Sequence, residues 1–124
     1  MQHCTYKAAA AQAAAIEKDW GRLSWLAGNT VGNADGLTLG RVLIRAGHSN
    51  PSHAHMNCEE ALYLLAGRLE HHTGEATGVL AAGDTLIVPA GVFHNATSIG
   101  EQDADMIVAY SSADRDFIKQ EETQ

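Results

Sequence analysis

The fold of this chain is decided by the stretch Gly47-His-Ser-Asn-Pro-Ser-His53-Ala-His55-Met-Asn-Cys-Glu-Glu60-Ala-Leu-Tyr-Leu-Leu-Ala-Gly67. His53 and His55 are two residues apart, and the side chains of an extended chain alternate between two faces. Both imidazoles therefore point the same way if residues 52–56 are extended. Glu60 begins an apolar run that ends before Gly67, which is typical of a strand that enters a turn.

Short strands are predicted over most of the remaining chain. The run 37–46 is rich in branched residues and ends at Gly47, as a strand does at a turn. Further short apolar or alternating runs cover 60–65, 68–72, 78–81, 85–88, 94–98 and 105–111, and glycine, proline or asparagine punctuates nearly every gap. Many short strands with little helix between them predict an all-β sandwich or barrel rather than a parallel sheet with crossovers.

The two ends of the chain carry different patterns. Alanine, the best intrinsic helix former, dominates residues 5–18, which predicts a short N-terminal helix that needs a surface to pack on. The last residues are mostly polar, which favours a terminal helical turn or a disordered tail. We therefore expect a helical or extended N-terminal arm with a first strand over 1–30, a barrel over 31–112 and a polar C-terminal tail over 113–124.

Size, charge and cysteine content exclude several classes of protein. The 124 residues suffice for one domain, which buries about two-thirds of the surface that the unfolded chain exposes. A total of 8 Lys and Arg against 15 Asp and Glu gives a net charge of −7, which argues against nucleic acid or an anionic membrane surface as partner and favours a small molecule. No apolar run approaches the roughly 20 residues that span a bilayer, and no secretory signal stands out, so we expect a cytoplasmic protein. Because Cys4 and Cys58 are the two cysteines, a disulfide scaffold is not expected.

Four side chains have the character of metal ligands, namely His53, His55, Glu60 and His94. A β-barrel can gather them around one divalent ion, with Glu60 and His94 supplied by later strands. Neutral imidazoles and one carboxylate suit iron, manganese, nickel, zinc or copper rather than calcium or magnesium. Such a set leaves two positions of an octahedral shell open, and an open position distinguishes a catalytic site from a structural one.

Two segments resemble the motifs of the cupin superfamily. The stretch from Gly47 to Gly67 has the spacing of the first cupin motif: glycine, five residues, His-x-His, three or four residues, glutamate, six residues, glycine. The stretch Gly83-Asp-Thr-Leu-Ile-Val-Pro89-Ala-Gly91-Val-Phe-His94-Asn-Ala-Thr-Ser98 resembles the second motif, apart from Ser98, where the family usually has asparagine. The resemblance covers roughly residues 37–110 and implies a small single-domain cupin of the cupin_2 type, a monocupin with a double-stranded β-helix, or jelly-roll, barrel. It also implies a homodimer in which edge strands and the N-terminal segment are exchanged.

Two neighbouring glutamates are candidates for the carboxylate ligand. On one unbroken strand, Glu59 shares the face of His53 and His55, and Glu60 does not. A bulge or turn within residues 56–58 shifts the parity by one and brings Glu60 to that face. Because the spacing from Glu60 to the next motif glycine matches the cupin pattern, the resemblance favours Glu60, with Glu59 as the alternative.

The resemblance to small cupins implies a metal-dependent enzyme that acts on a small molecule bound at the ion. Dioxygenation with iron, copper or nickel is the leading expectation, followed by decarboxylation with manganese and by isomerase or lyase reactions of sugars and uronates. Glu60 is the candidate base, and Tyr63 and Tyr110, on strands that could face the cavity, are candidate donors to the substrate. A non-catalytic cupin that binds a small ligand is the alternative from another class.

Other polar residues have simpler interpretations. His48 is expected in solvent, and His71 and His72 lie beside a Thr-Gly turn, where they are expected at the solvated end of a hairpin. Arg41 and Arg45 share one face of their strand. They favour an anionic substrate if that face lines the barrel mouth, and they are solvated if it is the outer face.

Overall fold

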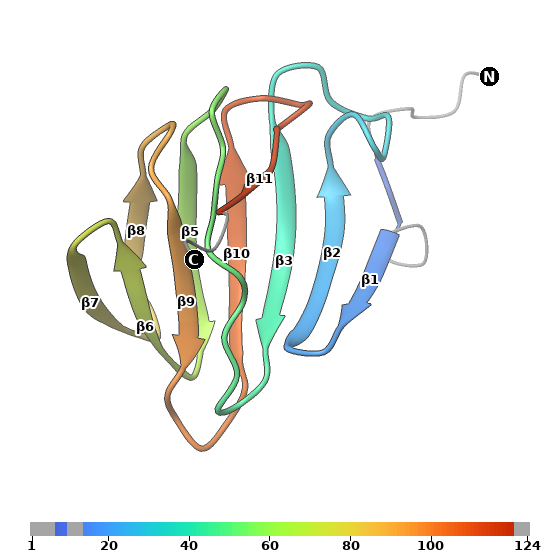
Figure 1. Cartoon of the computed structure of the whole chain (residues 1–124). Helices are drawn as coiled ribbons and strands as arrows, with labels where there is room; N and C mark the ends of the chain where they lie inside the picture. The colour runs from blue at the N-terminus through green and yellow to red at the C-terminus, as the bar shows by residue number, and fades with distance from the viewer. Residues whose placement is uncertain (1–6, 10–13, 121–124) are drawn as a thin grey trace.

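Two antiparallel sheets make up the structure, a computed structural model that describes residues 7–9 and 14–120. The six-stranded sheet has the order β1 (Ala14–Lys18), β2 (Gly21–Ala27), β3 (Thr38–Ile44), β10 (Ala104–Tyr110), β5 (Glu60–Ala66) and β8 (Thr85–Val88). The five-stranded sheet has the order β11 (Ile118–Lys119), β4 (His53–Ala54), β9 (His94–Ser98), β6 (Arg68–Thr73) and β7 (Ala76–Ala81). In Figure 1, β10, drawn in orange, lies between β3 and β5, although it is far from both in sequence. The predicted all-β jelly-roll barrel is confirmed.

Most strands lie where the alternating pattern predicts them. The runs predicted at 60–65, 85–88 and 94–98 correspond to β5, β8 and β9, and each strand starts at the predicted residue. Buried and partly exposed side chains alternate over the whole of β10, as expected of a strand that covers a core with one face.

The predicted N-terminal helix is wrong for the residues that the structure describes. Ala14–Lys18 form strand β1, which pairs with β2 over its full length. Intrinsic helix propensity is a weak preference, and here β2 offers a backbone edge as well as Arg22, whose Nε donates to Glu17 Oε1 at 2.6 Å. Residues 5–6 and 10–13 of the predicted helix lie outside the described residues. Within the described part of the chain, no helix is long and apolar enough to cross a membrane.

The C-terminal segment 113–120 is neither a helical turn nor a tail without contacts. Its strand β11 pairs with β4, and Gln120 N donates to Ser52 O at 3.0 Å. At the start of the segment, Ala113 O accepts a hydrogen bond from Asn29 N at 2.7 Å. The prediction was wrong because these backbone partners are distant in sequence, and a polar segment carries no local pattern that anticipates them.

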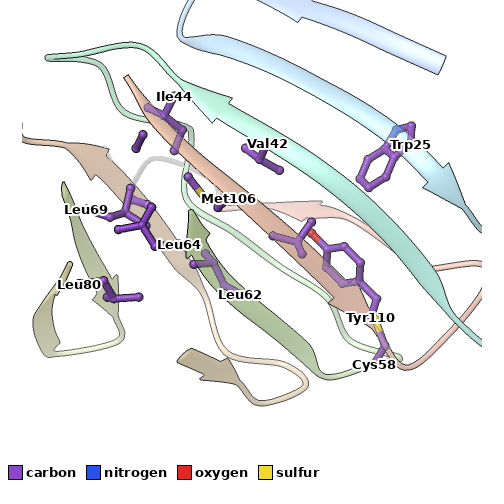
Figure 2. Close-up of a cluster of buried hydrophobic side chains, with 13 residues drawn as sticks. Trp25, Val42, Ile44, Cys58, Leu62, Leu64, Leu69, Leu80, Met106 and Tyr110 are labelled. Atoms are coloured by element: carbon purple, nitrogen blue, oxygen red, sulfur yellow. The ribbon is translucent and has the colours of Figure 1, made fainter. Parts of the chain in front are cut away.

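Apolar side chains from both sheets fill the space between them (Figure 2). The largest fully buried apolar side chains are Ile44, Leu64, Leu69, Met106, Val88 and Val108. Cys58 is buried as a free thiol. Gly67 makes the turn between β5 and β6 with a φ of +88°, and a Cβ atom there would lie 2.7 Å from Asp103 O, so glycine is required at this position.

Candidate metal centre

Four buried side chains meet at one point of the barrel interior. His53 opens β4, His55 follows this strand, Glu60 opens β5 and His94 opens β9. His53 and His94 are register partners on β4 and β9, and their ring centroids lie 4.3 Å apart. One ligand atom from each of the four residues lies within 4.8 Å of the others. The structure thus brings together the four side chains that the sequence singles out as ligands.

A bend after His55 decides which glutamate faces this cluster. Residues 56–57 form the bend, and β5 begins at Glu60. Glu60 is 5% exposed and points into the cluster, whereas Glu59 is exposed and its backbone N–H donates to Ser111 Oγ at 2.9 Å. The parity shift that brings Glu60 to the site therefore comes from a turn between two strands.

The three histidines present Nε2 to the cluster because Nδ1 of each ring is engaged elsewhere. Nδ1 lies 2.8 Å from Pro51 O in His53, 2.6 Å from Asp116 O in His55 and 3.0 Å from Val92 O in His94. A carbonyl oxygen can only accept, so each Nδ1 carries a proton and donates it. In the neutral ring, Nε2 then keeps its lone pair. Metal-binding histidines have this arrangement, in which the second ring nitrogen is held by an outer partner.

The electrostatics of the cluster favour a bound cation. Glu60 Oε1 lies 3.1 Å from His94 Nε2 and 3.4 Å from His55 Nε2. The buried His55 Nε2 has no hydrogen-bond partner among the described residues, which is unusual for a buried polar atom. A metal ion between these atoms satisfies the lone pairs and the carboxylate together. The set of three imidazoles and one carboxylate fits a single transition metal ion per chain.

Protonation equilibria favour the ligand forms of two of these groups near neutral pH. Burial raises the pKa of Glu60, but the close contacts with His55 and His94 outweigh burial and lower it to about 2. Burial lowers the pKa of His53 to about 4. Burial also lowers the pKa of His94, but contact with the Glu60 carboxylate outweighs this effect and raises it. His94 is therefore protonated more readily than a free imidazole, and a cation that binds its Nε2 must displace that proton.

A cavity of about 390 Å³ opens beside the cluster. His53, Glu60 and His94 form part of its wall, and apolar side chains of β2, β3 and β10 form much of the rest. Mostly apolar walls with a few polar groups are typical of small-molecule sites. The ligand cluster thus faces a space that can hold a substrate.

The two tyrosines predicted as substrate donors lie in different environments. Tyr110 is 6% exposed and lines the cavity, and its ring centroid lies 4.9 Å from that of His55. Burial raises the pKa of the Tyr110 phenol, so its hydroxyl is protonated at neutral pH. Tyr63 is 44% exposed, because it points to the face of β5 opposite to that of Glu60. The structure does not bring Tyr63 to the site.

His71 lies inside the barrel, and the expectation of a solvated position is wrong for this residue. It is 3% exposed, it lines the cavity, and its ring stacks on that of His94 with centroids 5.6 Å apart. Its Nδ1 lies 2.9 Å from Thr73 Oγ1, and burial lowers its pKa to about 4. β6 continues through both histidines, so alternation turns His71 inward and leaves His72 partly exposed.

Arg41 on β3 and Arg45 directly after this strand lie on the outer face. Arg41 Nε donates to Asp105 Oδ1 at 2.9 Å, and Arg45 Nη2 lies 3.6 Å from Glu17 Oε2. Both side chains are exposed and neither lines the cavity. Of the two alternatives left by the sequence, the solvated one is correct.

Residues of the C-terminal segment complete the site without a signal in the sequence. Asp116 Oδ1 accepts a hydrogen bond from Met56 N at 2.6 Å, in the bend between the ligands. The Phe117 ring stacks on that of His53 with centroids 4.8 Å apart, and Arg115 lines the cavity. These three residues follow no periodic pattern, and only the return of the chain along β4 brings them to the site.

Known proteins are similar to the central part of this chain. The family model Cupin_2, described as a cupin domain, matches residues 40–110. Germin-like protein 3-8 of Oryza sativa subsp. japonica is 33% identical over 85 residues, which cover 64% of this chain and 38% of that protein. Oxalate oxidase 2 of Hordeum vulgare is 28% identical over 88 residues, which cover 64% of this chain and 39% of that protein. The matched region is thus less than half of the length of either relative.

Solved structures share the fold. A structure of an oxalate oxidase superposes with a TM-score of 0.76 at 21% identity, over 83% of this chain and 56% of that chain. A formate complex of Lactobacillus farciminis oxalate decarboxylase superposes with a TM-score of 0.80 at 19% identity, over 88% of this chain and 34% of that chain. At these identities the likeness is one of fold.

Proposed function

Because the chain belongs to the Cupin_2 family of cupin domains, we propose that it is a metal-dependent enzyme that oxidises a small organic molecule at the His53, His55, Glu60 and His94 cluster. The observation that carries this proposal is a cluster of four ligand atoms that faces a cavity of about 390 Å³. A structural metal site needs no such cavity, because its ligands close the shell around the ion. Similarity to proteins named oxalate oxidases supports oxidation as the reaction class, and we propose dioxygenase-like chemistry as its leading form.

The side chains of the site divide into those that hold the ion and those that face the substrate. The three imidazoles and Glu60 would hold the ion, which supplies Lewis acidity and electron transfer when bound. Glu60 is the one carboxylate among the described residues of the cavity wall, and it is placed to accept a proton from a substrate hydroxyl. The Tyr110 hydroxyl faces the same cavity as a candidate hydrogen-bond donor to a substrate oxygen.

Metal analysis and oxygen uptake test this proposal together. Protein purified from cells grown without added metal is analysed for its metal content, and the resulting metalloform is assayed on a panel of small organic acids, including oxalate and glycolate. We expect close to one transition metal ion per chain and consumption of oxygen with at least one acid. The variant His94→Ala should lose both properties, whereas His48→Ala, which removes an exposed imidazole, should keep both.

Other results of the same experiment would point to the alternatives. Turnover that persists without oxygen and with zinc as the metal would contradict oxidation. It would indicate an isomerase, lyase or decarboxylase reaction of sugar-like or uronate-like substrates. Ligand binding without turnover in any metalloform would make the protein a small-ligand-binding cupin. If the protein binds no metal after reconstitution, the proposal of a metal-dependent enzyme is wrong.

Assembly and location are two further expectations. We expect a homodimer, because the outer face of neighbouring strands β5 and β8 exposes the apolar side chains of Tyr63, Leu65 and Ile87. Light scattering should give twice the mass of the chain, and Ile87→Asp should lower it to that of a monomer. A monomeric wild-type protein would refute the dimer. We also expect a cytoplasmic location, which fractionation of the source cells tests.

A further inference from the structure

The guanidinium group of Arg115 lines the cavity without an acidic partner. Its Cζ atom lies 4.2 Å from the ring centroid of Trp25 and 5.0 Å from that of Tyr110. Among the described residues, ion pairs of arginine involve Arg22, Arg41 and Arg45, and no carboxylate or hydrogen-bond acceptor engages Arg115. A guanidinium stacked on aromatic rings keeps its donors free, and those donors match the two oxygens of a carboxylate.

The aromatic platform under Arg115 is held firmly by the core. Trp25 is 8% exposed, and Figure 2 shows its ring and that of Tyr110 in the same buried cluster. A Cβ atom at position 40 would lie 2.7 Å from the Trp25 ring, so Gly40 on the neighbouring strand β3 provides the space that the indole occupies. The two rings meet edge to face with centroids 6.3 Å apart. The buried rings of Trp25 and Tyr110 therefore hold the guanidinium group of Arg115 in place.

The same wall contains a second polar group without a protein partner. The Tyr110 side chain is buried, yet its hydroxyl makes no hydrogen bond to the described residues. Buried tyrosine hydroxyls usually have such a partner. Because the Tyr110 ring contacts both His55 and the Arg115 guanidinium, a ligand that reaches from the metal cluster to Arg115 passes the Tyr110 side chain.

The charge and size of the cavity limit the ligand further. Its described wall contains the cations Lys18, Arg115 and Lys119 and the single acid Glu60, which the metal ion would neutralise in part. Trp20 and Leu23 are among the apolar side chains of the wall. A volume of about 390 Å³ lies within the range of roughly 300–1,000 Å³ that holds drug-sized ligands. The space thus suits a molecule larger than a two-carbon acid.

We propose that the substrate is an organic acid with an apolar body, whose carboxylate pairs with Arg115 while its body contacts the apolar wall that includes Trp20 and Leu23. Arg115 is then the residue that selects an acid over its neutral analogue. This inference rests on the proposed function in one respect, because it places the substrate between Arg115 and the metal cluster. It does not depend on the oxidation itself.

Binding of matched acid and amide probes tests the inference on the full chain loaded with zinc, which prevents oxidative turnover. The probes are benzoate, benzamide and oxalate, and binding is followed by calorimetry and by the tryptophan fluorescence that Trp20 and Trp25 provide. We expect wild-type protein to bind benzoate about tenfold or more tightly than benzamide, because a hydrogen bond to an ionised carboxylate is stronger than one to a neutral amide oxygen. Benzoate should also bind more tightly than oxalate.

Variants at position 115 separate charge, geometry and packing. Arg115→Gln and Arg115→Met should bind benzoate no better than benzamide, with zinc content unchanged. Arg115→Met also keeps an unbranched side chain over Trp25, so it serves if the glutamine variant folds poorly. Arg115→Lys should retain part of the preference, since it keeps the charge and loses the planar fork. Arg68→Gln, at an exposed position on β6, controls for the loss of one positive charge and should behave as wild type.

The outcomes distinguish this inference from the proposed function. If Arg115→Gln and Arg115→Met prefer benzoate over benzamide as strongly as wild type does, Arg115 does not select the acid. This outcome would overturn its role whether or not the enzyme consumes oxygen. If oxalate binds more tightly than benzoate, the inference that the substrate has an apolar body is wrong. An acid preference that depends on Arg115 in a protein without oxygen uptake would support the inference while the proposed oxidation fails.

Discussion

His55 and Asp116 are 61 residues apart in the sequence and are joined by a hydrogen bond of 2.6 Å, from the imidazole Nδ1–H to the backbone carbonyl. This bond fixes the proton on Nδ1 of His55 and leaves Nε2 for the metal cluster. Asp116 lies beyond residue 110, where the match to the cupin domain family ends. The C-terminal segment is therefore part of the candidate metal centre of this chain.

Removal of the Asp116 side chain should weaken metal binding without unfolding the protein. Asp116→Ala deletes the acceptor of the hydrogen bond from Met56 N, so the segment that orients His55 loosens. Alanine keeps the backbone carbonyl that accepts the hydrogen bond from His55, so metal affinity should fall by less than the roughly 10-fold to 100-fold that loss of such a partner costs. Competition with a chromophoric chelator measures this change. Asp114→Ala, at an exposed position in the same segment, is the matched control, and an equal loss in both variants would contradict the specific role of Asp116.

Metal should raise the melting temperature through the ligand cluster alone. An ion that binds the folded state stabilises it according to its concentration and affinity, by about 2.7 kcal/mol at 100 times its dissociation constant. His53→Ala should abolish the rise that wild type shows on addition of zinc. His72→Ala, on a partly exposed histidine, should preserve it. A full rise in His53→Ala would mean that the ion binds elsewhere, which calorimetric scans with and without zinc can reveal.

The metal-free protein should lose stability as the pH falls below the pKa of a free imidazole. Burial lowers the pKa of His71 to about 4 from 6.5, so between these values the unfolded chain binds the proton more readily than the folded chain. The contribution of neutral His71 to the free energy of unfolding is fully present above pH 6.5 and declines as the pH falls toward 4. For His71 alone, the decline from pH 7.5 to pH 5 is about 2 kcal/mol.

Urea unfolding of wild type and His71→Phe at pH 7.5 and pH 5 measures the contribution of His71. Phenylalanine keeps a ring against His94 and cannot be protonated, so the variant should lose less stability over this range. The Nδ1 contact with Thr73 Oγ1 is lost at both pH values and cancels in the comparison. Equal losses in the two proteins would show that His71 is not protonated on unfolding.

Truncation of a buried leucine should be costly, and truncation of an exposed one should not. Leu64 is 0% exposed in the core between the sheets, whereas Leu37 is 49% exposed before β3. Leu64→Ala should lower the free energy of unfolding by about 2–5 kcal/mol, because it removes buried methyl groups and leaves a cavity. Leu37→Ala should stay within about 0.5 kcal/mol. A small effect of Leu64→Ala would contradict the tight packing of this core.

The sequence by itself determined most strands of the barrel and the candidate histidine ligands. Period-two alternation is a local property, so the strands that begin at Glu60, Thr85 and His94 are visible without knowledge of their partners. The spacing of His53 and His55 likewise fixes their common side. The cupin resemblance added His94, since its second motif places a histidine at that position.

Only the tertiary structure decided the features that depend on distant backbone partners or on breaks in a strand. The bend after His55 resets the parity and selects Glu60 over Glu59, which alternation alone would not. Alternation along β6 places His71 and His72 on opposite faces, and only the packing of the two sheets makes the face of His71 the inner one. The free edge of β2 made a strand of Ala14–Lys18 against its helix propensity.

The C-terminal segment is the clearest case of this division. Arg115, Asp116 and Phe117 form no apolar stripe and no motif, so no local pattern distinguishes them from a solvated tail. The pairing of β11 with β4 carries them back to the ligands, because unpaired backbone groups at that edge require partners wherever the chain can supply them. Local sequence thus indicated the histidine ligands, and the tertiary structure decided the carboxylate and the residues that surround the site.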